Sequence, residues 1–243
     1  MLARNDTVVL LDVDNTLLDN DRFGADLGDR LADLFGAAER ERYWAIFAAL
    51  RSELGYADYL NALQTFRLAI ANDPQLLQMS EFLLEYPFAE RLYPRALETI
   101  ARLSTLGQTV ILSDGDIVFQ PRKIKRSGLW RAVDGRVIVG VHKERSLDDM
   151  RRRFPASHYV MVDDKPQLLV AMKRLLGAQL TTVFVRQGHY AAEARDTIFD
   201  PAPDHCIDRI ADLLERDIVP AVPRGGTMRG ASSNPGTDTK EST

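Results

Sequence analysis

The amino-acid sequence predicts an α/β fold, in which helices cover both faces of a parallel sheet and a bundle of helices is inserted after the first strand. Three observations support this prediction. Short apolar runs recur along the chain, helical patterns fill most of the intervals between them, and one long interval, about residues 17–90, carries helical patterns alone. Strands and helices that alternate at this length are typical of a parallel sheet between two layers of helices.

Five short apolar runs are predicted to be strands buried in the sheet. The first, Val8–Leu11, is partly β-branched and ends at acidic residues. The others are Thr109–Leu112, Val137–Val141, Tyr159–Val162 and Thr182–Val185. Apolar residues at helical spacing also predict helices over Leu92–Leu106 and Leu168–Leu176. Each of these two stretches is followed by a glycine, which is a common signal for the end of a helix.

The interval between about Leu17 and Glu90 contains four amphipathic helical patterns and no strand signal. Apolar residues recur there at helical spacing in four sets: Leu27, Leu31, Leu34 and Phe35; Tyr43, Phe47, Leu50 and Leu54; Leu60, Leu63, Phe66 and Ile70; and Leu76, Met79, Phe82 and Leu83. This spacing predicts a bundle of about four helices. The sequence Asn72-Asp73-Pro74 predicts a turn between two of them.

The composition is that of a globular protein, and it argues against some classes of function. The chain has 243 residues, of which 45% are hydrophobic and 27% charged, enough for one core and a smaller module. A net charge of −4 argues against a protein that coats nucleic acid. The single cysteine, Cys206, cannot form an intrachain disulfide, and we expect it in a helical region as a small apolar residue.

The sequence contains no apolar stretch of the length that a membrane span needs. The apolar run near the N-terminus is four residues long, whereas a span needs roughly 20 residues and a signal peptide also needs a longer run. We therefore expect a soluble, cytoplasmic protein that binds neither membranes nor nucleic acid. From Val219 onward Gly, Pro, Ser and Thr dominate, so residues 219–243 are expected to form a disordered tail.

Two carboxylates, Asp12 and Asp14, follow the first predicted strand directly. Ligand sites in open α/β sheets lie at this end of the strands. Carboxylates this close repel each other unless a cation lies between them, which favours Mg²⁺. A carboxylate held by a metal can attack a phosphate and form an aspartyl-phosphate, while a second carboxylate serves as general acid and base. The alternative interpretation is an acidic turn in solvent.

Three further loops place polar residues at the end of a strand or the start of a helix. In Ser113-Asp114-Gly115-Asp116, a hydroxyl and backbone N–H groups can bind an anion, although an ordinary helix N-cap has the same pattern. Lys143 can neutralise a phosphate or lie in solvent. Asp163-Asp164 can bind a cation or form a turn. A doubly wound sheet brings such loops together in one crevice, which favours the functional interpretations.

The four loops, in this order, resemble the four motifs of the haloacid dehalogenase (HAD) superfamily. The sequence Asp12-x-Asp14-x-Thr16-Leu17 resembles the first motif, Ser113 the second, Lys143 the third and Asp163-Asp164 the fourth. The resemblance covers roughly residues 6–215. It implies a Rossmann-like three-layer core at residues 1–16 and 91–218. It also implies a helical cap of the C1 type at residues 17–90, which closes over the site and selects substrates.

The resemblance implies a role for each motif residue. Asp12 would be the nucleophile and a Mg²⁺ ligand, and Asp14 would be the acid and base as well as a ligand through its backbone carbonyl. The phosphoryl group would be bound by Ser113, Asp114 and Lys143. Asp164 would bind Mg²⁺ with Asp163 assisting directly or through water, and Thr16 would support the first loop. In one departure from the family, Asp163 replaces a common glycine and Leu168 a common aspartate of the fourth motif.

These residues predict a magnesium-dependent phosphatase that acts on a small phosphorylated metabolite, as a monomer or homodimer. Release of a halide needs neither an acid such as Asp14 nor Mg²⁺, so phosphoryl transfer is favoured over dehalogenation. A phosphomutase, a haloacid dehalogenase and a binding protein without catalysis are the alternatives. Substrate choice would depend on the cap residues that could face the site: Arg22, Phe23, Tyr43, Trp44, Arg51, Tyr56 and Tyr59.

Overall fold

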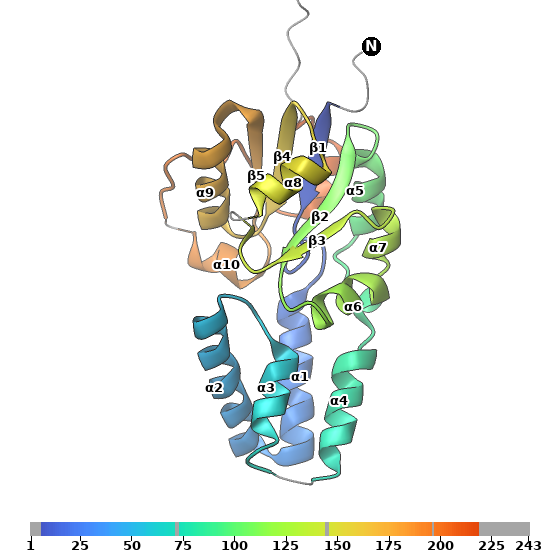
Figure 1. The fold of residues 1–243 in the computed structure, drawn as a ribbon, viewed down its shortest axis with the longest axis vertical. Helices are drawn as coiled ribbons and strands as arrows, with labels where there is room; N and C mark the ends of the chain where they lie inside the picture. Colours follow the sequence, from blue (N-terminus) through green and yellow to red (C-terminus); the bar gives the residue numbers. More distant parts are fainter. Residues whose placement is uncertain (1–5, 71–72, 144–145, 196, 219–243) are drawn as a thin grey trace, which may run out of the picture.

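Six parallel strands form one sheet in the structure, a computed structural model that describes residues 6–70, 73–143, 146–195 and 197–218. Their order across the sheet is β3-β2-β1-β4-β5-β6 (Figure 1). The strands are β1 (Thr7–Leu11), β2 (Gln108–Asp114), β3 (Val137–Gly140), β4 (His158–Asp163), β5 (Leu180–Val185) and β6 (His205–Ile207). The α/β fold and the five predicted strands are confirmed.

Strand β6 is absent from the predicted strands. It has three residues, and Ile207 alone among them is buried. So short an edge strand offers too few apolar positions to show a period. The placement of Cys206 in a helical region is wrong, because this residue lies in β6 with an exposed side chain.

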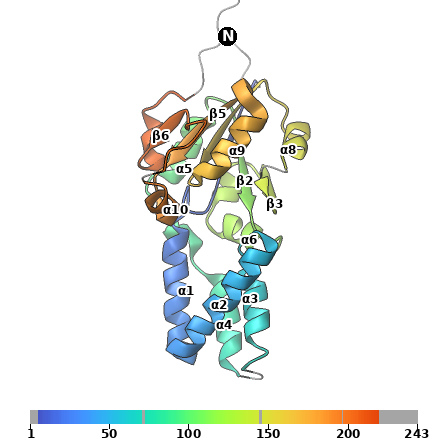
Figure 2. The ribbon, with the colours of Figure 1, turned by 90° about the vertical axis from the view of Figure 1, so that its left-hand side faces the viewer.

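The central strand β1 is buried on both faces. Val9 and Leu11 belong to one apolar cluster and Val8 and Leu10 to another, because side chains alternate along a strand. The first cluster includes residues of α5 (Ala96–Leu103), α6 (Phe119–Arg126), α7 (Leu129–Ala132) and η4 (Ile210–Leu214). The second includes residues of α8 (Leu147–Arg153) and α9 (Pro166–Leu176), with α10 (Gly188–Glu193) packed beside it. Figure 2 shows where α5, α8, α9 and α10 lie around the sheet. Burial on both faces explains the uninterrupted apolar run of β1.

The helix predicted over Leu92–Leu106 is shorter in the structure, where it is α5 and begins at Ala96. Pro94 favours an extended backbone at the residue before it. Arg95 has a left-handed backbone, with φ of 64°. The helix therefore begins only after this turn. The prediction of α9 is confirmed, and this helix ends at Leu176 just before Gly177.

Four helices lie between β1 and α5 in the sequence: α1 (Asn20–Phe35), α2 (Ala37–Leu54), α3 (Tyr59–Phe66) and α4 (Gln75–Glu85). Each overlaps one predicted amphipathic pattern, although α3 ends at Phe66, before the last residue of its pattern, Ile70. They lie together beyond the carboxyl ends of the strands (Figure 1), and we call residues 20–85 the helical layer. The predicted division into core and cap domains stays a prediction, and the predicted tail lies outside the described residues. None of the described helices has the length and apolar character needed to cross a membrane.

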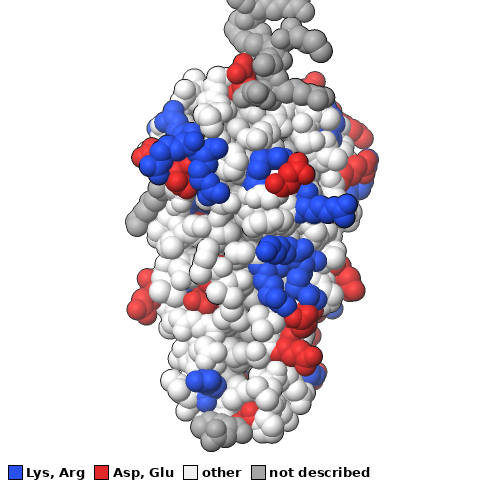
Figure 3. Space-filling view, turned by 45° about the vertical axis from the view of Figure 1, so that its right-hand side comes forward, with Lys and Arg blue, Asp and Glu red and all other residues white. Residues whose placement is uncertain are grey.

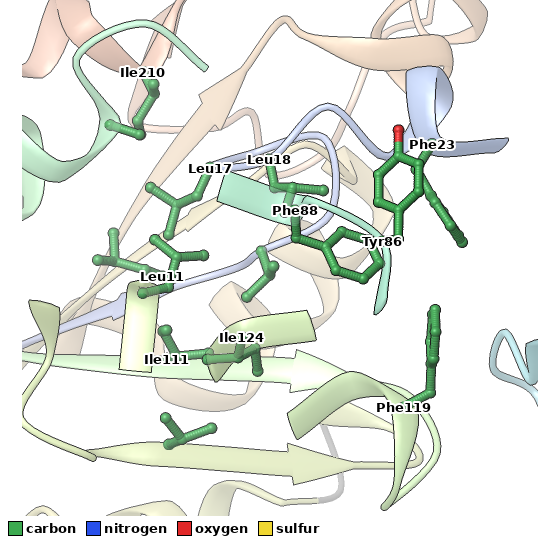
Figure 4. Packing of buried hydrophobic residues seen from close by; sticks show 14 of the residues in the cluster. Leu11, Leu17, Leu18, Phe23, Tyr86, Phe88, Ile111, Phe119, Ile124 and Ile210 are labelled. Carbon is green, nitrogen blue, oxygen red and sulfur yellow. The ribbon is translucent and has the colours of Figure 1, made fainter. Parts of the chain in front are cut away.

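Aromatic side chains join the helical layer to the core. The ring of Phe23 in α1 lies 4.9 Å from that of Tyr86, 5.1 Å from that of Phe88 in η1 (Phe88–Arg91) and 5.8 Å from that of Phe119 in α6 (Figure 4). These separations are typical of aromatic rings in contact. One apolar cluster therefore runs without a break from the sheet into the helical layer.

Charged side chains join the same two parts at the surface. Arg122 and Arg126 of α6 both contact the carboxylate of Glu85 at the end of α4, and the Arg126 contact is 2.8 Å long. Arg126 also donates to the backbone carbonyl of Glu85 at 2.7 Å. Figure 3 shows basic and acidic groups next to one another on one side of the molecule. Exposed ion pairs contribute little each, so the apolar cluster is the main contact between the two parts.

Candidate active site

The predicted site residues lie together at the carboxyl ends of neighbouring strands. Asp12 follows β1, Ser113 lies near the end of β2, Lys143 follows β3, and Asp163 ends β4. These four side chains and that of Asp164 are buried. Because β1 lies between β2 and β4, the loops that follow these strands meet at the carboxyl end of the sheet.

Three carboxylates and one ammonium group form a buried cluster there. One carboxylate oxygen from each of Asp12, Asp163 and Asp164 lies within 4.8 Å of the other two. Lys143 Nζ donates to Asp12 Oδ1 and, at 2.7 Å, to Asp163 Oδ2. Burial lowers the pKa of Lys143, but the attraction of Asp12 and Asp163 outweighs burial and raises this pKa above its ordinary value. A single charged ammonium group therefore faces three acids within this cluster.

The adjacent acids Asp163 and Asp164 have different surroundings. Asp163 accepts from Lys143 with one oxygen and from the backbone N–H of Lys165, at 2.9 Å, with the other. Both oxygens of Asp164 are buried and have no hydrogen-bond partner in the described part of the chain. Burial raises the pKa of both carboxyls, and Asp12 raises both further. A buried carboxylate without a partner is costly, so a divalent cation beside Asp12 and Asp164 fits this site.

Asp14 lies in a more open environment than the buried acids. Its side chain is 25% exposed, and it lines a pocket. Oδ1 accepts from Lys123 Nζ at 2.7 Å, and Oδ2 accepts from Gln120 Nε2 at 3.2 Å. Two donors from α6 therefore fix the orientation of this carboxylate.

Lys123 is fully buried, which is rare for a lysine. Its Nζ also donates to Asn20 Oδ1 at 2.9 Å, at the start of α1. Four aromatic rings have their centroids 5.7 or 5.8 Å from the ammonium group, close enough for cation–π attraction: Phe23, Tyr59, Phe88 and Phe119. The sequence did not point to Lys123, because it stands in a charged run and its partner Asp14 lies 109 residues earlier.

The remaining predicted residues surround Asp12. Thr16 Oγ1 donates to Asp12 Oδ2 at 3.2 Å. Ser113 Oγ accepts from Gln120 Nε2 at 2.9 Å, which leaves its own hydroxyl hydrogen available for a ligand. Burial raises the pKa of Asp114 to about 6. Because a carboxylate repels a phosphate, the side chain of Asp114 suits phosphate binding only when it is protonated.

Gln187, just after β5, holds the loop that follows β1. Its Nε2 donates to the backbone carbonyls of Asn15, at 3.2 Å, and Thr16, at 3.0 Å. Its Oε1 accepts from the backbone N–H of Ile210 at 2.7 Å. These bonds support Asn15 in a left-handed conformation, with φ of 59°, that residues other than glycine rarely adopt. Its position two residues after a predicted strand is the one sequence signal that could have indicated Gln187.

A pocket of about 330 Å³ lies between these loops and the helical layer. Asp14 and Asp114 border it from the core. Four of the helical-layer residues named from the sequence line it: Trp44, Arg51, Tyr56 and Tyr59. The other three do not, because Arg22 pairs with Asp26 at 2.9 Å on the surface and Phe23 and Tyr43 are buried in the apolar cluster. His189 and Tyr190 of α10, which were not predicted, complete the wall.

Comparison with known families agrees with this geometry. The profile of the haloacid dehalogenase-like hydrolases matches residues 7–185. The chain belongs to this family. The matched segment contains all four motifs, so the resemblance to the HAD superfamily is confirmed.

Solved structures support the same assignment. A protein from Burkholderia xenovorans LB400, assigned to the haloacid dehalogenase-like hydrolases, is 56% identical, with a TM-score of 0.82 over 88% of this chain and 97% of that chain. L-2-haloacid dehalogenase from Xanthobacter autotrophicus is 18% identical, with a TM-score of 0.56 over 86% and 96% of the two chains. The magnesium-bound HAD hydrolase YfnB from Bacillus subtilis is 16% identical, with a TM-score of 0.58 over 87% and 98%. The last two show the fold alone. Curated proteins give no match.

Proposed function

We propose that this HAD-family protein is a magnesium-dependent phosphatase that acts on a small phosphorylated metabolite through an aspartyl-phosphate on Asp12. The observation that carries the proposal is Asp164, whose two buried oxygens have no partner in the part of the chain that is described and which lies beside Asp12. Neighbouring buried acids of this kind favour a bound cation. Departure of a halide from carbon gains nothing from such a cation, whereas phosphoryl transfer does.

The groups that would hold Mg²⁺ are the carboxylates of Asp12 and Asp164 and the backbone carbonyl of Asp14. Oxygen ligands of this type are those that Mg²⁺ prefers. Asp163 is engaged by Lys143 and by the backbone of Lys165, so we assign it to holding Lys143 rather than to direct ligation. When bound, the cation neutralises negative charge on the nucleophile and on the phosphoryl group.

In the first step, an oxygen of Asp12 attacks phosphorus and the bond from phosphorus to the leaving-group oxygen breaks. Asp14, which lines the pocket, gives a proton to that oxygen. Lys143 and the Ser113 hydroxyl donate hydrogen bonds to the phosphoryl oxygens, where negative charge is concentrated. The hydrogen bond from Lys143 to Asp163 keeps the ammonium group in place during this step.

In the second step, water attacks phosphorus and the bond from phosphorus to Asp12 breaks. Asp14, now a carboxylate, takes a proton from the water, and free phosphate leaves. Lys123 and Gln120 hold Asp14 in one orientation through both steps. In this proposal the helical layer is the cap, because it closes the pocket over Asp14 with Tyr59 and its neighbours and limits the size of the leaving group.

Phosphate release from a panel of phosphorylated metabolites, with Mg²⁺ or with EDTA, tests the proposal. We expect turnover only with Mg²⁺. Asp12→Asn should lower kcat/KM by about 10⁴-fold or more, because it removes the nucleophile. The matched control is Asp134→Asn, since Asp134 is 78% exposed in the turn before β3 and should leave turnover unchanged.

Parallel assays separate the phosphatase from its alternatives. Halide release from 2-haloacids without Mg²⁺ would indicate a dehalogenase. An isomerised phosphosugar with no free phosphate would indicate a mutase. Either result, or equal activity of Asp12→Asn and the unaltered protein, overturns the phosphatase proposal.

A further inference from the structure

The pocket is bordered by two cations that the mechanism does not use, Arg51 of α2 and Lys165 before α9. Both lie near the ring of Tyr190 in α10. Arg51 Cζ is 5.8 Å from the ring centroid, and Lys165 Nζ is 5.3 Å from it. The face of a tyrosine ring attracts cations. Three segments far apart in the sequence therefore bring two positive charges to one side of the pocket.

Neither cation forms an ion pair with a carboxylate of the described residues. Two acids of the pocket are paired elsewhere: Asp14 contacts Lys123 at 2.7 Å, and Asp21 contacts His189 at 2.7 Å. The third acid, Asp114, attracts Lys165 without forming an ion pair with it, so both cations can still bind an anion that enters the pocket.

The amide side chains that could recognise neutral hydroxyl groups are already hydrogen-bonded. Asn20 donates to the Tyr59 hydroxyl at 3.3 Å and accepts from Lys123 at 2.9 Å. Asn15 donates to the Asp21 carboxylate at 2.9 Å and accepts from the backbone N–H of Asp21 at 3.2 Å. Among the charged groups that line the pocket, Arg51 and Lys165 are therefore the ones suited to bind an anionic leaving group.

We propose that the substrate is a phosphate ester whose leaving group carries a second anionic group, a carboxylate or a second phosphate, bound by Arg51 and Lys165 beside Tyr190. The inference rests on the proposed phosphatase function and adds the class of substrate. Guanidinium and ammonium groups suit either anion. The pocket volume of about 330 Å³ lies at the lower end of the usual range for ligand pockets, roughly 300–1,000 Å³, and fits a small molecule.

The second anion would also connect the two parts of the molecule. Arg51 belongs to the helical layer and Lys165 to the core, so an anion held by both would draw them together. A neutral leaving group makes no such connection. The pair of cations would thus select the substrate through contacts from both parts of the molecule.

Two esters that differ in one group test the inference: 3-phosphoglycerate, which has a carboxylate, and glycerol 3-phosphate, which has a hydroxymethyl group in its place. We expect kcat/KM to be at least about 10-fold higher for the carboxylate, the usual effect of a hydrogen bond to a charged group. Arg51→Met and Lys165→Met should each lower that ratio by about 10-fold. A bisphosphate of 1,3-propanediol, compared with the monophosphate, tests a second phosphate in the same way.

Arg42→Met is the matched control, because Arg42 is on the same helix, is 52% exposed and pairs with Glu39 at 3.8 Å. It should leave both ratios unchanged. If the unaltered protein hydrolyses charged and neutral esters equally, or if Arg51→Met and Lys165→Met leave the ratios as they are, the inference is wrong and the phosphatase proposal stands. Failure to hydrolyse any ester with Mg²⁺ overturns both.

Discussion

Charged side chains are buried at the carboxyl end of the sheet and largely exposed in the helical layer. At the sheet, the side chains of Asp12, Lys143 and Asp163 are at most 3% exposed and fix one another. In the helical layer, Arg22 is 61% exposed and pairs with Asp26 within one helix. Loss of one partner costs about 3–5 kcal/mol for a buried pair but about 0–1 kcal/mol for an exposed pair. Asp12, Lys143 and Asp163, which are proposed for chemistry, thus lie where substitution is costly, whereas the exposed Arg51, proposed for selectivity, lies where substitution costs little.

Lys143→Met should cause the largest loss of stability and activity, because it removes the ammonium group that Asp12 and Asp163 share. Both carboxylates would remain buried without it. We expect losses of about 3–5 kcal/mol in the free energy of unfolding and about 10³-fold in kcat/KM. Denaturant unfolding and the phosphatase assay measure these losses. Arg152→Met, which removes an exposed pair with Asp149, should cost at most about 1 kcal/mol, and equal losses in the two variants would contradict the comparison.

Lys123→Met should have an intermediate effect. Lys123 is as buried as Lys143, but its partner Asp14 is 25% exposed and can be hydrated when the pair is lost. We expect a loss of about 2 kcal/mol in the free energy of unfolding and about 10-fold in kcat, because Asp14 is less well oriented. Lys125→Met, on the exposed side of the same helix, is the control. A loss as large as that of Lys143→Met would mean that exposure of the partner does not set the cost.

Asp114→Asn should have the smallest effect, which appears in the pH dependence of stability. Burial raises the pKa of Asp114 from 3.8 to about 6, so between these values the folded protein binds a proton that the unfolded chain has lost. Stability from this group is therefore lost as pH rises through that window. With EDTA present, the melting temperature relative to that of Asp114→Asn should fall by about 6 °C from pH 4 to pH 6, which corresponds to roughly 2 kcal/mol. A constant difference would refute the burial of Asp114.

The local features of the candidate site were predictable from the sequence. Asp12 and Asp163 each follow an apolar run that is visible as a strand, and a parallel sheet brings such strand ends together. The residues that orient this cluster were not predictable. Lys123 acts on Asp14 across 109 positions and Gln187 on Thr16 across 171 positions, and no local pattern records contacts at that range.

The helical layer shows the same limit. Apolar spacing predicted all four helices, because it determines which side of each helix is buried. It could not separate Arg51, which borders the pocket, from Arg22, which lies on the outer surface. Both are charged residues on exposed sides of helices, and the difference between them arises only from how the helices pack on the core.

The hydrogen bonds of Gln187 bear on where this protein could be joined to a relative in a chimera. The family match ends at Val185, and a segment cut there would contain every motif of the family. It would lack the amide group that supports the carbonyls of Asn15 and Thr16, and also Ile210, which anchors that amide. In a chimera joined at Val185, the loop that contains Asn15 and Thr16 would therefore contact a side chain from the relative in place of Gln187. A junction that keeps these hydrogen bonds has to lie beyond η4, and beyond Ile218 if it is also to keep the buried apolar cluster intact.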